Sequence, residues 1–279
     1  MKNLAAIIIY CVFITSERVN HHAPIHFLGS STHDTAATQN ASVEFYIRPA
    51  GYTKIMNMTD TKIAYAQKIS ADLFEAVEQN NLIVAGKSEE QLNEEVVQLA
   101  REKFGVEAHW HKKIVRAGIN TMAIYPDNPP SQIIKADDIV ILDYGIIVDG
   151  YEADYARTYV LGNDARKLKL KHDVEKAWYE IQDWYLKQTE VKASDLFALT
   201  RKKASEYGWT SVGIIAGHIV GKYPHEQPAD SKSWELDVHP DNHNNIVLRD
   251  ANGNKRHWIL EVHFVDKENN IGAYFEQLL

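Results

Sequence analysis

Cysteine is almost absent from this 279-residue chain, and its absence limits both covalent and metal chemistry. The single cysteine, Cys11, cannot form an internal disulfide, and a zinc site built from thiolates is excluded. The side chains left to hold a metal are histidine, aspartate and glutamate. Such ligands suit borderline or hard ions, here Mn, Co, Zn or Fe.

An excess of positive charge is missing as well. The formal net charge is −8 at pH 7, and no run of lysine or arginine stands out. We expect no nucleic-acid partner, because a phosphate-binding groove needs clustered positive charge. With 45% hydrophobic and 24% charged residues, the chain can still form an ordinary globular core.

The apolar run in residues 1–16 is too short for a stable membrane span. One lysine followed by an apolar stretch is typical of a signal peptide, but no A-x-A cleavage pattern follows. The alternatives are an N-terminal strand or a start codon placed too early. We expect a cytoplasmic protein, or an exported, periplasmic one if residues 1–16 are a signal peptide.

The helical signals begin after a mixed, polar segment. Residues 17–57 are predicted to be a linker or arm, so we divide the chain into an N-terminal segment, 1–57, and a domain, 58–279. Apolar residues at three- and four-residue steps predict a helix over 60–79. A second helix is predicted between a capping box at Ser88 and Gly105.

The same order of elements returns in the second half of the chain. A helix is predicted over 164–188, followed by one with Ser194 as its N-cap that ends near Gly208. In each half the predicted order of elements is a helix, a capped helix, strands and a hairpin. This repeated pattern predicts an α+β fold with pseudo-twofold halves, in which two sheets meet inside and helices lie outside.

The segment 136–162 predicts a hairpin that brings two acids to one face. Asp149-Gly150 between two apolar, β-rich runs indicates a two-residue turn, which places Gly145 opposite Asp154. Asp143 lies on the same face as a diagonal neighbour of Asp154, roughly 7–8 Å away at the backbone. Two ions about 3.5–4 Å apart fit between carboxylates at such a spacing. Alternatively, one aspartate caps a turn or pairs with Arg157.

A second hairpin is predicted over the last 23 residues of the chain, 257–279. A loop over 267–270 places Glu261 directly opposite Glu276, where like charges destabilise a sheet. Both glutamates could point to solvent, but Ile259 and Tyr274 share their face and would be exposed with them. Burial of the two glutamates against a cation is the better interpretation.

The segment AGHIVGKYPHEQP, 216–228, adds two nitrogen donors, His218 and His225. It is not the helical zinc motif, because Ala229 stands where that motif has its second histidine and Pro228 stops a helix. A lone histidine next to glycine is often a core or loop residue. Beside four candidate carboxylates, a neutral imidazole completes a ligand set for two metals.

These residues, in this order, resemble the pita-bread metallopeptidases: methionine aminopeptidase, aminopeptidase P, prolidase and creatinase. The resemblance covers about Asp60 to the C-terminus, that is, the catalytic domain only. It is carried by four stretches: LDYGIIVDGYEADYARTYVLG, AGHIVGKYPHEQP, WILEVHF and GAYFEQLL. Arg157-Thr158 and VRAGINT, 115–121, are most similar to the aminopeptidase P and prolidase branch.

The resemblance implies a pita-bread fold and a role for each matching residue. Asp143 would bind one metal, Asp154 and Glu276 would bridge both, and His218 and Glu261 would bind the other. Glu261 would also handle the proton of the attacking water. His225 would contact substrate and steady the tetrahedral intermediate.

The implied function is a dinuclear-metal hydrolase, with Mn favoured, that removes an N-terminal residue from a peptide substrate. It would be a metallo-aminopeptidase or dipeptidase, with Xaa-Pro peptides as candidate substrates and a homodimer as a candidate assembly. The alternatives are a creatinase-like C–N hydrolase and a non-catalytic binding module of the same fold.

The sequence departs from the family pattern at two places near the site. Ile219 replaces the glycine that follows the ligand histidine, and the upstream substrate-facing histidine has no match near Ala123 or Ile124. A polar insert, 230–255, is a candidate lid over the site or a solvated surface loop.

Overall fold

The structure is a computed structural model and describes residues 58–228, 230, 233–250 and 252–279. The predicted signal peptide and linker in residues 1–57 therefore lie outside the described residues. The described residues belong to one compact unit. Within them, no helix combines the length and hydrophobicity that crossing a bilayer requires.

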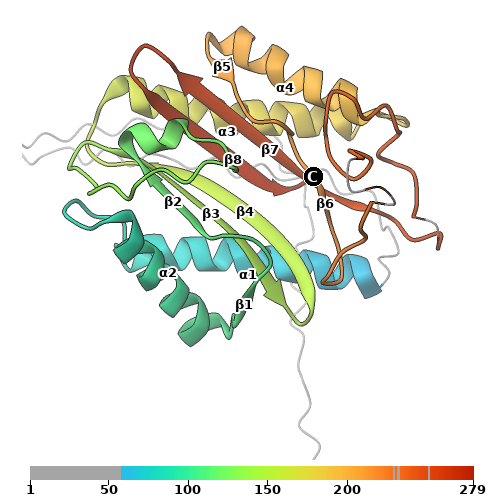
Figure 1. The fold of residues 1–279 in the computed structure, drawn as a ribbon, viewed down its shortest axis with the longest axis horizontal. Helices are drawn as coiled ribbons and strands as arrows, with labels where there is room; N and C mark the ends of the chain where they lie inside the picture. Colours follow the sequence, from blue (N-terminus) through green and yellow to red (C-terminus); the bar gives the residue numbers. More distant parts are fainter. Residues whose placement is uncertain (1–57, 229, 231–232, 251) are drawn as a thin grey trace, which may run out of the picture. The chain divides into compact units, whose positions relative to one another are not determined.

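Two long antiparallel hairpins form the centre of the fold (Figure 1). One joins β3 (Ile139–Val148) to β4 (Tyr151–Val160), and the other joins β7 (His257–Asp266) to β8 (Ile271–Leu278). The strand order is β1-β3-β4-β8-β7-β5, with β2 also pairing β3 and β6 pairing β7. The short strands are β1 (Ala108–His109), β2 (Ile114–Ala117), β5 (Thr210–Ser211) and β6 (Ile219–Val220).

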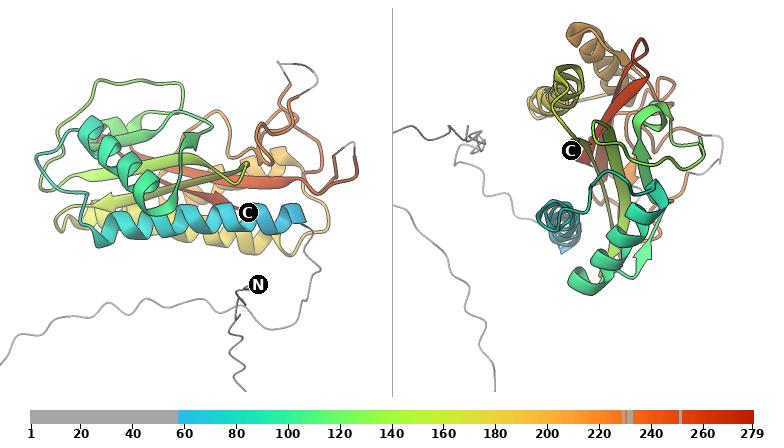
Figure 2. Two further views of the ribbon diagram at one scale, coloured as in Figure 1. Left: turned by 90° about the horizontal axis from the view of Figure 1, so that it is seen from below. Right: turned by 90° about the vertical axis from the view of Figure 1, so that its left-hand side faces the viewer.

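The helices repeat in the two halves. They are α1 (Met58–Gln79), α2 (Glu89–Phe104), the 3-10 helix η1 (Gly118–Met122), α3 (Ala165–Tyr185) and α4 (Ala193–Tyr207). Helix α1 packs on the first hairpin and α3 on the second. Figure 2 shows α1 and α3 on the same side of the sheet. The predicted α+β architecture with helices outside is confirmed.

Each half has its own apolar core between its hairpin and its helices. In the first half, Tyr144 is fully buried and its hydroxyl donates to Asn93 Oδ1 at 2.9 Å. In the second, the buried Trp178 donates from Nε1 to Leu260 O at 2.8 Å. Both rings bury a large apolar area and satisfy their polar atom, so the helices fix the back of each hairpin.

The helix caps follow the sequence prediction at three ends out of four. Ser88 and Gln91 form the predicted capping box of α2, and Gly105 and Gly208 end α2 and α4 in the left-handed conformation. Ser194 is not the N-cap of α4, so that prediction was wrong. The N-cap is Lys192, two residues earlier, and the Ser194 N–H donates to the Asn242 carbonyl at 2.8 Å. A loop of the 230–255 insert thus satisfies a free helix donor.

The predicted two sheets meet as one sheet, through a short junction between β4 and β8. The only ladder pair there is Ala156 with Glu276. Two side chains extend it. The Thr158 hydroxyl donates to Tyr274 O at 2.9 Å and accepts from Tyr274 N at 2.7 Å. The Arg157 guanidinium donates to Glu276 O at 3.0 Å.

Arg157 therefore does not pair with an aspartate of the first hairpin, the alternative that the sequence left open. It lies on the face of β4 opposite to Asp154, because side chains alternate along a strand. Its guanidinium is buried between the rings of Tyr155 and Phe275, each centroid 3.7 Å away. Together with Thr158 it holds the two halves of the sheet in register.

Candidate metal centre

The register of both hairpins is the one the sequence predicts. Gly145 faces Asp154 across the first hairpin, and Glu261 faces Glu276 across the second. Because β4 lies beside β8, the two acid pairs converge on one face of the continuous sheet. Asp143, Asp154 and Glu276 are almost fully buried there.

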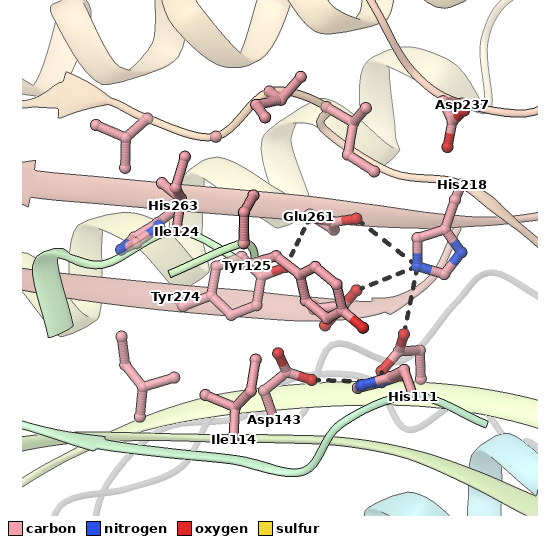
Figure 3. A pocket seen from close by; sticks show the side chains of 18 of the residues that line it. His111, Ile114, Ile124, Tyr125, Asp143, His218, Asp237, Glu261, His263 and Tyr274 are labelled. Carbon is pink, nitrogen blue, oxygen red and sulfur yellow. Dashed lines mark hydrogen bonds and ion pairs between the residues drawn. The ribbon is translucent and has the colours of Figure 1, made fainter. Parts of the chain in front are cut away.

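His218 completes the predicted group and comes from the residue before β6. Its Nε2 lies 3.3 Å from Asp154 Oδ2 and 3.7 Å from both Glu261 Oε1 and Glu276 Oε1. Figure 3 shows this imidazole pointing at the carboxylates from the right-hand end of the pocket. The structure thus brings all five predicted ligands together.

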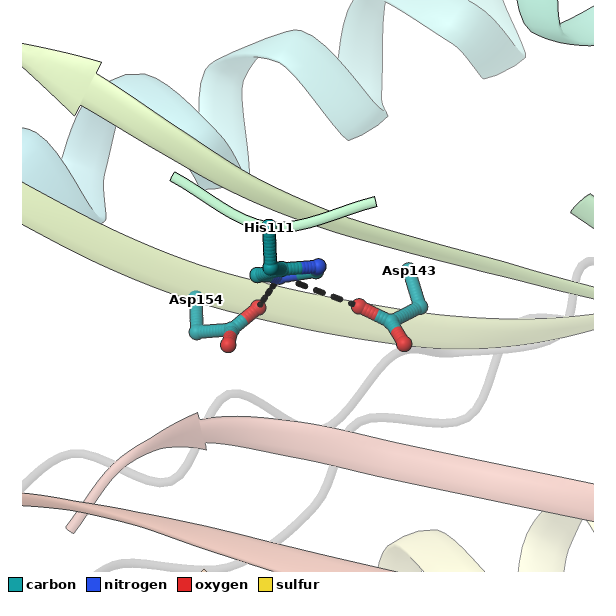
Figure 4. Close-up of side chains that lie close together, drawn as sticks. All are labelled: His111, Asp143 and Asp154. Carbon is teal, nitrogen blue, oxygen red and sulfur yellow. Dashed lines mark hydrogen bonds and ion pairs between the residues drawn. The ribbon is translucent and has the colours of Figure 1, made fainter. Parts of the chain in front are cut away.

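A second histidine, His111, enters the same cage and was missed by the sequence analysis. Its Nε2 lies 3.0 Å from Asp154 Oδ1 and 3.7 Å from Asp143 Oδ1 (Figure 4). The side chain of His111 is only 6% exposed. Asp154 therefore presents one oxygen to His111 and the other to His218.

The glycine opposite Asp154 explains how His111 reaches the cage. A Cβ on Gly145 would lie 2.0 Å from His111 Cδ2 and 2.6 Å from Trp110 Nε1. Those distances are far inside van der Waals contact, so only glycine leaves room for both rings. The sequence did contain a signal for this contact. The space left beside Gly145 has to be filled by a side chain from another segment, and the aromatic segment HWH, 109–111, follows the start of β1, which pairs with β3.

Burial and mutual repulsion shape the titration of the acids. Burial, reinforced by the carboxylate of Asp154, raises the pKa of Asp143 to about 7, although His111 opposes the shift. Burial also raises the pKa of Glu261, and burial together with the two aspartates raises that of Glu276 well above its usual range. Four carboxylates in so small a buried volume need cations to stay ionised.

The two imidazoles supply part of that compensation. Burial opposes a charge on His111, but its contacts with Asp154 and Asp143 outweigh burial and raise its pKa to about 9. The pKa of His218 also rises, because Asp154 and Glu276 accept from it despite its burial. Burial alone would raise the pKa of Asp154, yet the two imidazoles hold it well below its usual range.

His225 lies at the edge of the cage and is held by a buried acid. Its Nδ1–H donates to Glu152 Oε2 at 2.8 Å, and its backbone N–H donates to Glu152 Oε1 at 3.1 Å. Glu152 is fully buried and also accepts from Gly221 N at 3.0 Å. The ring is thereby fixed with Nε2 left for a ligand in the pocket. Glu152 is a second residue that the sequence analysis missed.

The cage forms the floor of a cavity of about 350 Å³. Its apolar walls come from the segments 110–126 and 212–215 and from β3. The apolar side chains that line them are Ile114, Ile124, Tyr125, Ile141, Val212, Ile214 and Ile215. Ile124 lines the wall near the place where the sequence analysis found no family histidine. The pocket is thus open to a substrate with an apolar group.

Part of the 230–255 insert belongs to the pocket and the core, so it is not simply a solvated loop. Trp234 and Asp237 line the cavity, and Trp234 stacks on His239 with centroids 3.9 Å apart. Leu236, Val238 and Ile246 of the insert are buried in the core of the second half. The described part of the insert is therefore anchored beside the site.

The chemistry of the donor set fits two divalent ions. His111, Asp143 and Asp154 form one group whose donor atoms lie within 4.8 Å of one another, and Asp154, His218 and Glu276 form another. Asp143 Oδ1 is buried, and no hydrogen bond from the described residues reaches it. A buried carboxylate oxygen without a donor needs a cation.

A family comparison agrees with this geometry. The profile of metallopeptidase family M24 matches residues 61–252, more than half of the chain. This chain belongs to metallopeptidase family M24. The family is one of hydrolases, and it includes the proteins that the sequence resembles. The matched range ends before Glu261 and Glu276, which the structure places beside the other candidate ligands.

Relatives with known names come from two groups of the family. The chain is 29% identical over 111 residues to a methionine aminopeptidase of Aquifex aeolicus, covering 39% of this chain and 42% of the relative. It is 28% identical over 129 residues to an Xaa-Pro dipeptidase of Lactobacillus helveticus, covering 45% and 34%. The chain thus matches less than half the length of these relatives.

Solved structures confirm the pita-bread fold. A dipeptidase of Pyrococcus horikoshii superposes with a TM-score of 0.62 and 25% identity, covering 77% of this chain and 55% of that one. A methionine aminopeptidase of Thermotoga maritima superposes with a TM-score of 0.58 and 18% identity, covering 78% and 90%. At these identities the likeness establishes the fold, while the substrate remains a separate question.

Proposed function

We propose that residues 58–279 form the catalytic domain of a dinuclear-metal hydrolase that removes an N-terminal residue from peptides. The observation that carries this proposal is the convergence of three buried acids, the partly buried Glu261 and His218 on one face of the sheet. Asp143 would hold one ion, His218 and Glu261 the other, and Asp154 and Glu276 both. Mn is the metal we favour, because most of these donors are carboxylates.

When bound, the ions would activate a water molecule and polarise the scissile carbonyl. The chain's own residues would do the rest. Glu261 would accept the proton of the attacking water, because its carboxylate lies among the candidate ligands, opposite Glu276 and 3.7 Å from His218 Nε2. Tyr274 donates from its hydroxyl to Glu261 Oε2 at 2.7 Å and so fixes the orientation of that carboxylate.

As an imidazolium, with a proton on each ring nitrogen, His225 would donate from Nε2 to the oxygen of the scissile carbonyl as negative charge develops on it. Glu152 accepts from Nδ1, which fixes the ring before substrate arrives. The Trp110 ring packs edge-on against His225 with centroids 5.6 Å apart and restricts its movement further. Because the donor is already oriented, no free energy of reorganisation is needed during the reaction.

The apolar walls favour Xaa-Pro peptides as the first substrates to test. A proline ring offers apolar surface and no N–H, so it suits a wall of isoleucine side chains such as Ile114, Ile124 and Ile214. Met-Xaa peptides are the second substrates to test, because the relatives include a methionine aminopeptidase as well as an Xaa-Pro dipeptidase.

Metal removal tests the proposal. Hydrolysis of Xaa-Pro and Met-Xaa peptides is measured before chelation, after chelation with EDTA, and after return of Mn or Co. We expect activity to disappear on chelation and to recover with metal. Activity that persists in EDTA would instead favour a creatinase-like C–N hydrolase. A protein that takes up no metal and cleaves neither peptide would favour a binding module.

A further inference from the structure

We propose that His111 is a sixth protein ligand of the metal centre and holds the first ion together with Asp143 and Asp154. This inference rests on the proposed dinuclear function and extends its ligand set. It assigns one imidazole to each ion: His111 to the first and His218 to the second. The distances around His111, the orientation of its ring and the packing against it support this assignment.

The distances suit a shared ion. His111 Nε2 lies 3.0 Å from Asp154 Oδ1 and 3.7 Å from Asp143 Oδ1. Nitrogen and oxygen ligands lie about 2.0–2.2 Å from ions such as zinc, so two ligands of one ion are about 3.0–4.2 Å apart, depending on the angle. Both observed distances fall in this range. The oxygen of Asp143 that faces His111 is also the buried one without a donor.

The orientation of the ring is the one that a metal-binding histidine needs. His111 Nδ1 lies 2.6 Å from the carbonyl oxygen of Lys112, the next residue along the chain. His218 Nδ1 likewise lies 2.9 Å from the carbonyl oxygen of Ile219. In the neutral ring the Nδ1–H donates to that carbonyl, which leaves the Nε2 lone pair pointing into the cage. In both histidines, the contact of Nδ1 with the next carbonyl thus directs Nε2 towards the carboxylates.

Packing keeps the His111 ring in place. It occupies the space beside Gly145, where an added Cβ would lie 2.0 Å from His111 Cδ2. The Trp110 ring packs edge-on against it with centroids 4.6 Å apart, and the Trp110 Nε1–H donates to Ala153 O at 3.1 Å. The ring therefore has no room to swing away from the two aspartates.

A nitrogen ligand at the first ion has a consequence for metal selectivity. A site made only of carboxylates suits Mn, whereas an imidazole raises the relative affinity for Co and Zn. Replacement of His111 should therefore weaken the binding of Co more than that of Mn. The competing explanation is that His111 is a permanent cation that pairs with the aspartates and excludes the first ion.

Cobalt-loaded protein separates these explanations without an activity assay. The Nδ1–H of each Co-bound imidazole gives an exchangeable, strongly shifted proton resonance that disappears in D₂O. We expect two such resonances in the unmodified protein, one from His111 and one from His218. Uptake of two Co ions with a single exchangeable resonance would overturn the inference while leaving the proposed function intact. Failure to bind any metal would overturn the proposed function as well.

Titration calorimetry of variants gives an independent readout. His111→Ala should lose one exchangeable resonance and weaken the first Co ion by at least about 100-fold, since loss of supporting residues around a metal already costs 10–100-fold. The matched control is His109→Ala, which removes an imidazole two residues away that does not line the cavity. It should leave both resonances and both affinities unchanged. Unchanged Co affinity in His111→Ala would contradict the assignment.

A third variant tests the same ligand with His111 itself retained. Gly145→Ala should displace the ring, because the added Cβ occupies its position, and should reproduce the loss of one resonance. If His111→Ala fails to fold, the resonance count of the unmodified protein and the conservative variant His111→Gln still decide the question. Retention of both resonances in Gly145→Ala would show that the ring is not held as described.

Discussion

The two halves of the molecule supply equivalent donors from different sequences. The first half brings His111, Asp143 and Asp154, and the second brings His218, Glu261 and Glu276. In both halves the histidine lies next to a short strand that pairs with the outer strand of the hairpin, β1 on β3 and β6 on β7. The pseudo-twofold relation therefore holds for elements and donor atoms, without similarity of sequence.

The halves differ in how each hairpin makes room for its acids. In the first hairpin Asp154 faces Gly145, and the open space is filled by a ring from outside the hairpin. In the second, Glu261 faces Glu276 directly, and the hydroxyl of Tyr274 stabilises one of them. The comparison shows that a buried acid pair can be accommodated by a neighbour's ring or by a hydroxyl on the same hairpin.

The largest effect is expected from replacing Asp154, the acid that contacts the histidine of each half, His111 and His218. Asp154→Asn takes charge away from the two oxygens that face His111 and His218. We expect kcat/KM to fall by at least about 10³, which corresponds to about 4 kcal/mol, with loss of bound metal. The control is Asp149→Asn on the same hairpin, an exposed turn residue. Full metal content in Asp154→Asn would contradict its bridging position.

A smaller loss of activity is expected from replacing His225, a histidine of the second half that is not a candidate ligand. His225→Ala removes the donor to the developing oxyanion, so kcat should fall by about 10²–10³. Metal content should not change, because His225 is in neither ligand group. Kinetics and metal analysis of the same sample check this, with His109→Ala as control. Loss of metal in His225→Ala would instead place this residue among the ligands.

The junction between the halves can be weakened directly. Arg157→Leu removes the donor to Glu276 O and the cation between Tyr155 and Phe275. We expect about 2–3 kcal/mol of lost stability, measured by urea unfolding of the metal-loaded protein. Arg101→Leu on α2 is the control, because its exposed pair with Glu107 contributes little. Equal effects of both variants would disprove the junction role.

The smallest expected effect concerns a buried histidine of the second hairpin. Burial lowers the pKa of His263 to about 4, below the value near 6.5 of an unfolded chain. Between these values the unfolded state binds a proton that the folded state excludes, so stability is lost as pH falls from 6.5 towards 4. At pH 5 the loss is about 2 kcal/mol.

Unfolding of the metal-loaded protein at pH 7 and pH 5 measures this loss. His263→Gln retains a donor for Thr121 O, which His263 Nε2 contacts at 2.9 Å. The variant should lose about 2 kcal/mol less on acidification than the unmodified chain. The same pH dependence in both proteins would show that other groups cause it.

Much of the scaffold could be predicted because the signals were local. The turn Asp149-Gly150 determined the register of the first hairpin, and the loop over 267–270 that of the second. Side-chain alternation then placed the acids on one face of each hairpin. The cap at Ser194 failed as a prediction because its competitor, the Asn242 carbonyl, arrives from a distant loop.

The sequence by itself determined the two hairpins, their acids and the family to which the chain belongs. Only the tertiary structure decided that His111 and Glu152 join the site and that Arg157 holds β4 against β8. The physical reason is separation along the chain. A hairpin is specified by neighbouring residues, whereas these contacts form between segments that only the packing of the complete fold brings together.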